Sequence, residues 1–109
     1  MVRNFLGMSV SANYFMGVEA VGGKIWFYET FFMFKPHSFN FQTKETVIYY
    51  AQINNVTKRN TLGLVPNGMS VFTFDGKEHK FVLWDRSEII DFLNFKAAEL
   101  RTPYRTPNI

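Results

Sequence analysis

The chain has 109 residues, a length that fits one domain built around one hydrophobic core. Hydrophobic residues make up 47% of it and 13 residues are Phe, so the core needs no disulfide or metal, and we expect most of these rings to lie inside. The absence of cysteine excludes disulfides, thiolate metal sites and cysteine nucleophiles. The formal charge of +3 favours an anionic partner only weakly, because Lys and Glu are interspersed along the chain.

The sequence contains no recognisable targeting or membrane-spanning segment. Polar residues interrupt the apolar content of the first 14 positions, and no apolar run approaches the roughly 20 residues that cross a bilayer. We therefore expect a cytoplasmic protein, at most peripheral to the inner face of the membrane. We predict an N-terminal extension at 1–12, one domain at 13–100 and an irregular, proline-containing tail at 101–109.

The first half of the domain predicts a meander of strands. Gly22-Gly23 suits a tight turn, because glycine tolerates positive φ. Glu29-Thr30 divides two β-rich runs and predicts a second hairpin. The residues at 36–44 include Pro, His, Ser, Asn and Gln, which predict a long loop. The strands expected around these turns are 14–21, 25–28, 31–35 and 46–51.

The second half predicts three more strands. The segment 59–67 contains Gly63 and Pro66 and predicts a loop, with Leu64 as its buried anchor. Asp75-Gly76 is the strongest short-range hairpin signal in the chain. The expected strands are 53–58, 69–74 and 77–84.

A helix follows from Asp85. Asp85 and Glu88, three residues apart, have the spacing of a capping box. Apolar residues then recur at helical spacing, at Ile89, Ile90, Leu93, Ala97 and Leu100. About seven antiparallel strands followed by one amphipathic helix predict an α+β fold, a β-barrel capped by a single C-terminal helix.

Several motifs occur in the order known from one family. They are GGKIWF at 22–27, MFKPHSFNF at 33–41, INNV at 53–56, LGLVPNG at 62–68, DGK at 75–77 and KFV at 80–82. Together they resemble the bacterial GRAM domain of the PH-like superfamily, over roughly residues 14–93. The resemblance implies a PH-like barrel similar to modules that bind phosphoinositides, phosphatidylserine or proteins. The chain departs from the pattern at 28–31, where related sequences often carry a Thr and a basic residue.

A basic rim is one candidate site. Alternate connections of a meander fall at one end of a barrel, and we expect the cations near them to gather there. The residues of this rim are Lys24, Lys35, His37, Lys44, Lys58 and Arg59. The turn before Lys24 is too short for a phosphate-binding loop, and each cation near an anionic leaflet adds only about 1 kcal/mol. We therefore expect weak headgroup selectivity, and rank an anionic membrane surface second among the partners.

A protein partner or self-association ranks first. Phe92 and Phe95 fall away from the Ile89–Ala97 edge of the helix, which predicts an exposed apolar patch, although a wide core face gives the same pattern. Single-stranded nucleic acid ranks last. It requires aromatic side chains that point outward beside cations, and alternation alone cannot fix their direction. The aromatic residues considered are Trp26, Tyr28, Tyr49 and Tyr50.

Catalysis has little support in the sequence. The only histidines are His37, expected to hydrogen-bond the backbone of a loop, and His79, expected on the solvent face of a strand. No histidine pair or carboxylate cluster has metal-ligand spacing. Asp85, Glu88 and Asp91 suit helix capping better than acid-base chemistry. We predict a non-catalytic binding or scaffold module with no catalytic residue, metal or cofactor.

Overall fold

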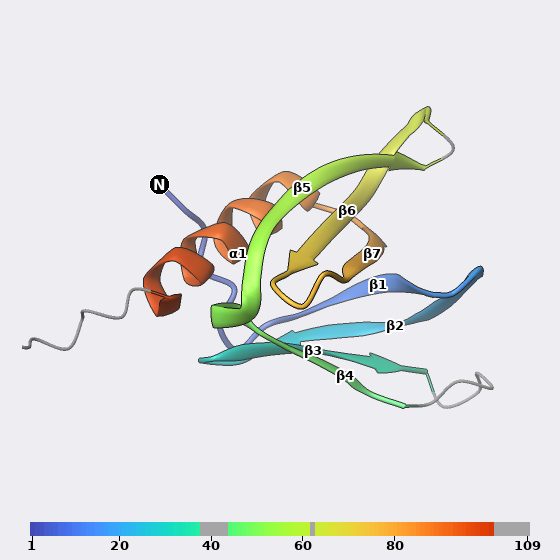
Figure 1. Ribbon diagram of the computed structural model, residues 1–109. Helices are drawn as coiled ribbons and strands as arrows, with labels where there is room; N and C mark the ends of the chain where they lie inside the picture. The colour runs from blue at the N-terminus through green and yellow to red at the C-terminus, as the bar shows by residue number, and fades with distance from the viewer. Residues whose placement is uncertain (38–43, 62, 102–109) are drawn as a thin grey trace, which may run out of the picture.

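The computed structural model describes residues 1–37, 44–61 and 63–101. All seven strands join in one antiparallel sheet, in the order β4-β3-β2-β1-β7-β6-β5, which curls into a half-barrel beside one C-terminal helix (Figure 1). The predicted fold class is therefore confirmed. The elements are β1 (Ser9–Met16), β2 (Glu19–Phe27), β3 (Phe31–Pro36), β4 (Thr46–Tyr49), the 3₁₀ turn η1 (Tyr50–Gln52), β5 (Ile53–Thr61), β6 (Val65–Thr73), β7 (Glu78–Leu83) and α1 (Arg86–Arg101).

The first hairpin is not where the sequence predicted it. Gly22 and Gly23 lie inside β2, paired with Asn13 and Ala12 of β1, and the chain reverses instead at Gly17, whose φ is 68°. A side chain at Gly23 would collide with the Lys35 carbonyl oxygen and the Phe34 ring. This glycine therefore permits close contact between strands, and the predicted strand at 14–21 is wrong.

The other two predicted hairpins are confirmed. The Tyr28 amide donates to the Phe31 carbonyl at 2.9 Å, which closes the turn at Glu29-Thr30. In the Asp75-Gly76 turn Gly76 has φ 87°, and the Asp75 carboxylate accepts hydrogen bonds from the Thr73 hydroxyl and the Lys77 amide.

The predicted loop at 59–67 is mostly strand. β5 continues to Thr61 and β6 begins at Val65, so the connection is short. Leu64 is 83% exposed and is no buried anchor. The predicted strand at 46–51 ends early, because the chain turns at η1 and directs Tyr50 into the core, where its hydroxyl donates to the Tyr28 carbonyl.

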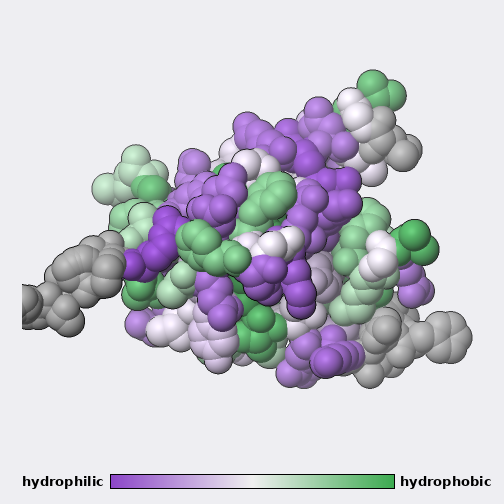
Figure 2. Space-filling view, in the orientation of Figure 1, coloured by the Kyte–Doolittle hydropathy of each residue, from purple (hydrophilic) through white to green (hydrophobic). Residues whose placement is uncertain are grey.

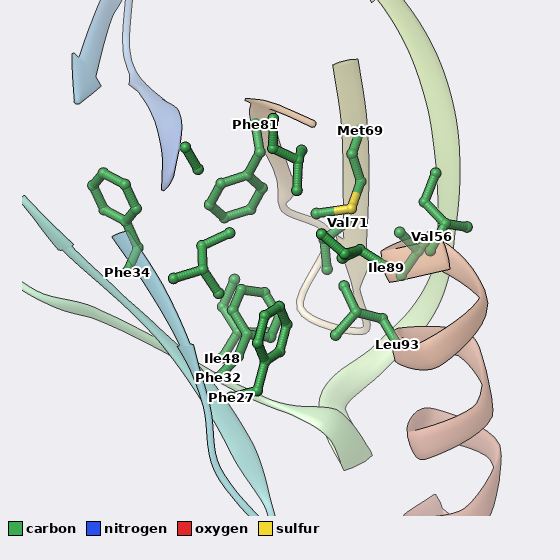
Figure 3. Packing of buried hydrophobic residues seen from close by; sticks show 14 of the residues in the cluster. Phe27, Phe32, Phe34, Ile48, Val56, Met69, Val71, Phe81, Ile89 and Leu93 are labelled. Atoms are coloured by element: carbon green, nitrogen blue, oxygen red, sulfur yellow. The ribbon is translucent and has the colours of Figure 1, made fainter. Parts of the chain in front are cut away.

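The core fills the space between the concave side of the sheet and α1. Figure 3 shows Phe27, Phe32 and Phe34 on one side, with Ile89 and Leu93 of the helix approaching from the other. Phe5 is fully buried, and its ring centroid lies 5.5 Å from that of Phe27. The division at residue 12 is therefore wrong, since the N-terminal segment belongs to the core. Residues 102–109 of the predicted tail lie outside the described residues.

The helix starts without the predicted capping box. Asp85 adopts φ 57° and its carbonyl accepts the Ile89 amide, whereas the Glu88 carboxylate pairs with Arg3 at 3.0 Å. The predicted apolar positions do face the sheet, with Ile89, Ile90, Leu93 and Ala97 buried. In the described ranges, no helix is long and apolar enough to cross a membrane.

Polar side chains of α1 bind the outer edge of β5. The Asn94 amide group accepts from the Val56 N–H at 3.0 Å and donates to the Val56 carbonyl at 3.1 Å. Arg101 donates to the Ile53 carbonyl, whereas Arg86 donates to the carbonyls of the paired residues Arg59 of β5 and Gly68 of β6. One edge of the sheet is thus hydrogen-bonded by the helix.

We expect Asn94→Ala to lower the free energy of unfolding by about 1–3 kcal/mol, because both main-chain groups of Val56 lose their partner. Chemical denaturation measures this change. Asn55→Ala, at an exposed position of the same strand, is the control and should change stability by less than about 0.5 kcal/mol. Equal effects of the two substitutions would contradict the assigned role of Asn94.

Candidate binding surface

Alternation along β2 divides its side chains between core and solvent. Val21, Ile25 and Phe27 are buried, whereas Lys24 and Trp26 are exposed. The same alternation in β3 and β4 directs a second set of side chains to the convex side of the sheet. We call the apolar part of this face the aromatic strip, which consists of Trp26, Tyr28, Phe31, Met33, Val47 and Tyr49.

The strip is continuous across three strands. Trp26 is in register with Met33, and Met33 with Val47. Beyond this row, the Phe31 ring centroid lies 4.8 Å from that of Tyr28 and 5.5 Å from that of Tyr49. Trp26, Tyr28, Val47 and Tyr49 are 37%, 42%, 43% and 48% exposed. The described part of the chain therefore presents a cohesive apolar surface to solvent.

Two of the predicted rim cations meet beside this strip. Lys24 of β2 is directly opposite Lys35 of β3, and both are exposed. Like charges in directly opposite positions destabilise a sheet. Neither residue takes part in the two ion pairs found among the described residues. An anion bound here would relieve their repulsion.

The other predicted rim residues are dispersed. His37 follows β3, and its backbone amide donates to the Gly22 carbonyl, which places it near the lysine pair. Lys44 is exposed just before β4. Lys58 and Arg59 lie on β5, the opposite edge strand of the sheet, and the Arg59 guanidinium stacks 5.6 Å from the Phe15 ring centroid. The six residues therefore do not form one cluster.

Half of the predicted helix patch is wrong. Phe92 is 2% exposed, and its ring contacts Phe5, Phe27 and Tyr50 in the core. For Phe92 the alternative interpretation that the sequence allowed, a wide core face of the helix, is therefore correct. Phe95 is 52% exposed and lines a groove of 440 Å³ together with Met1, Val2 and Leu6 of the N-terminal segment.

Three of the four aromatic residues considered for base stacking do point outward. Trp26, Tyr28 and Tyr49 belong to the aromatic strip, whereas Tyr50 is fully buried. The sequence did not identify Phe31, Met33 and Val47 as parts of the same surface. The strand alternation contained that signal, but only the pairing of β3 with both neighbours brings the residues together.

His79 is half-buried on the concave side of the sheet, so the predicted solvent-facing position is wrong. Its Nδ1 lies 2.7 Å from the Tyr14 hydroxyl, and the two rings are stacked. Burial raises the pKa of Tyr14, so this hydroxyl keeps its proton and forms a neutral hydrogen bond with the His79 ring. Burial lowers the pKa of His79 from its ordinary 6.5; the Asp75 carboxylate opposes this shift and Lys77 adds to it. The described residues contain no group of three or more His, Cys, Asp or Glu that could hold a metal.

Two hairpin tips at one end of the half-barrel carry exposed aliphatic residues. The β1–β2 and β5–β6 connections lie at the same end (Figure 1). Val18 at the first is fully exposed, and Leu64 at the second is 83% exposed. Figure 2 shows apolar atoms at these tips and a mostly hydrophilic surface over β5 between them and the helix. The tips are therefore an apolar feature separate from the aromatic strip.

Comparisons with known proteins find structural neighbours only. No family model and no curated protein matches the chain. The C-terminal domain of an unknown protein from Leishmania infantum is similar with a TM-score of 0.65 and 14% identity, over 88% of this chain and 82% of that one. Inner Membrane Complex sub-compartment protein 3 from Toxoplasma gondii is similar with a TM-score of 0.59 and 13% identity, over 85% and 74% of the two chains. At these identities the likeness shows the fold alone.

The lowered pKa of His79 predicts that acid destabilises the domain. The unfolded chain binds the proton more readily than the folded one, so this contribution to stability is complete above the ordinary pKa of 6.5 and is lost as pH falls below it. Urea denaturation from about pH 8 to about pH 5.5 should show falling stability. His79→Gln keeps a hydrogen-bond acceptor but does not titrate, and should flatten the dependence. An unchanged dependence in this variant would contradict the prediction.

Proposed function

We propose that this domain is a non-catalytic binding module that holds a protein partner on the outer face of β2, β3 and β4. The aromatic strip is the observation that supports this proposal. Large contiguous apolar patches on a soluble domain mark interaction sites, whereas scattered single residues do not. Trp and Tyr, which dominate the exposed part of the strip, are also the residues that contribute most at protein interfaces.

The lysine pair gives this surface a preferred charge. Lys24 and Lys35 border Trp26 and Met33 in the adjoining register positions. A partner with a carboxylate there would reduce the repulsion between the two ammonium groups, while apolar groups next to it would cover the strip. We therefore expect a partner segment with acidic residues next to apolar ones.

The composition of the strip favours protein over single-stranded nucleic acid. Stacking platforms alternate aromatic rings with cations that follow the phosphate backbone. Here Met33 and Val47 lie in register beside Trp26, and the turn beyond Tyr28 carries the acidic Glu29. The lysine pair borders the strip at Trp26 and Met33. Aliphatic side chains and a nearby carboxylate suit a protein surface better than a phosphate chain.

Selection from a random peptide library on the immobilised domain tests the proposal. Trp26→Ala and Tyr49→Ala should each weaken the selected peptides by roughly 30-fold or more, as expected for central aromatic residues of an interface. Fluorescence anisotropy measures the affinities. Phe95→Ala is the control, because Phe95 is a comparably exposed aromatic residue on the helix. No enriched peptide, or equal losses at Phe95, would contradict the proposal.

Peripheral binding of an anionic membrane is a second candidate, supported by the exposed Val18 and Leu64 at two tips of one end. Under this candidate the double substitution Val18→Asp/Leu64→Asp should abolish co-sedimentation with phosphatidylserine vesicles at low salt, since carboxylates oppose insertion beside anionic headgroups. Trp26→Ala should leave vesicle binding unchanged. Absence of wild-type binding to these vesicles, or binding that survives the double substitution, would reject the candidate.

A further inference from the structure

The two edges of the sheet differ in how their main-chain groups are used. The edge of β5 is hydrogen-bonded by Asn94 and Arg101 of the helix. β4 forms the other edge, and within the described ranges β3 is its only strand partner. An edge strand with unpaired N–H and C=O groups can pair with another chain. Another chain could bind those main-chain N–H and C=O groups of β4 that point away from β3.

The hydrogen bonds beside β4 fix these directions. The Tyr50 amide donates to the Thr30 carbonyl, so the main-chain groups of Tyr50 point toward β3. Directions alternate along a strand, so Ile48 also points toward β3, whereas Val47 and Tyr49 direct their N–H and C=O groups to the open side. Tyr49 is also the N-cap of η1, and the carbonyl of an N-cap residue accepts the first hydrogen bond of its helix. Among the described residues, the groups of β4 left for another chain on this side are therefore the N–H and C=O of Val47 and the N–H of Tyr49.

A groove of 270 Å³ runs along this open side. One wall consists of Thr46, Val47 and Ile48 of β4, and the other comes from the end of β6, the β6–β7 turn and the start of β7. Gln52 of η1 also lines the groove. The residues of the second wall are Thr73, Phe74, Asp75, Lys77 and His79. The groove therefore lies where an added strand would lie, about 4.8 Å to the side of β4.

We infer that an extended segment of a partner protein pairs with β4 and lies in this groove as an eighth strand. The inference rests on the proposed function and specifies how the partner is held. Main-chain hydrogen bonds to both groups of Val47 and to the N–H of Tyr49 can be formed by any extended chain. The edge therefore selects the conformation of the partner segment, and the side chains select its sequence.

The two faces of the added strand meet different surroundings. Residues opposite Val47 and Tyr49 point to the convex side, where they extend the aromatic strip, and cross-strand pairs of aromatic and β-branched residues are stabilising. The residue between them points to the concave side, toward Thr46, Lys77 and His79 on the groove walls. The expected segment therefore alternates apolar or aromatic residues with polar ones.

Val47→Pro tests the inference. Proline removes the outward Val47 N–H, while the hydrogen bonds to β3 remain with Thr46 and Ile48, and proline is tolerated on edge strands. We expect the peptides selected on the wild-type domain to bind Val47→Pro about tenfold or more weakly. Val47→Thr is the matched control, because it keeps the N–H and the β-branched shape, and its affinity should stay within about threefold.

Backbone N-methylation of the peptide provides a second measurement on the unaltered domain. Methyl groups at successive peptide residues should weaken binding at every second position only, because alternate N–H groups face β4. If thermal melting shows that Val47→Pro does not fold, this periodicity tests the inference in its place. Equal effects at all positions would overturn the inference.

The remaining outcomes separate this inference from the proposed function. If Trp26→Ala weakens binding while Val47→Pro and peptide methylation do not, the edge-strand mode is overturned and the proposed function is supported. No selected peptide overturns both. A domain that sediments as a dimer, and as a monomer after Val47→Pro, would show that a second copy of the chain occupies the edge, which overturns the assignment to a partner protein.

Discussion

The register between β2 and β3 determines which side chains this domain offers to a partner. Gly23 has no space for a side chain against the Lys35 carbonyl and the Phe34 ring, so the two strands approach closely at this point. A slip of one residue would exchange the two faces, burying Lys24 and Trp26 and exposing Ile25 and Phe27. The burial of Ile25 and Phe27 therefore fixes the outward direction of Lys24 and Trp26. The core and the candidate binding surface depend on the same register.

The helix stabilises the fold and also limits where another chain can bind. It buries Ile89, Leu93 and Phe92 against the concave side of the sheet, and its polar side chains bind the main chain of β5. An extended segment that joined β5 near Val56 would have to displace Asn94 from two hydrogen bonds. β4 has no such covering element among the described residues. The asymmetry between the two edges thus follows from the position of one helix.

Local patterns predicted the fold class and most elements. The turns at Glu29-Thr30 and Asp75-Gly76 were predictable because each depends on residues within the turn itself. Gly22-Gly23 was misleading, because glycine serves both tight turns and close strand contacts, and only the neighbouring strand distinguishes them. Phe5 was missed for a similar reason, since its burial depends on Phe27 and Phe92, which are distant in sequence.

The candidate binding surface was less predictable than the fold because it depends on pairing between strands. The sequence identified Lys24 and Lys35 as members of a rim, but their direct opposition follows only from the β2–β3 register. It also assigned Phe92 and Phe95 to one patch, whereas the N-terminal segment covers the first and leaves the second exposed. Helical spacing defines the direction of a side chain, but an element elsewhere in the sequence decides whether that direction is covered.

The positions of the exposed features along the barrel show that the two candidate functions can coexist. β2 runs from the β1–β2 tip toward Tyr28, so the ring cluster of Tyr28, Phe31 and Tyr49 lies at the end away from the tips (Figure 1). Lys24 and Lys35 lie between this cluster and the tips. A surface that contacted the tips would approach along the strands, whereas a chain paired with β4 would approach from the side. Occupation of one region would therefore leave the other accessible.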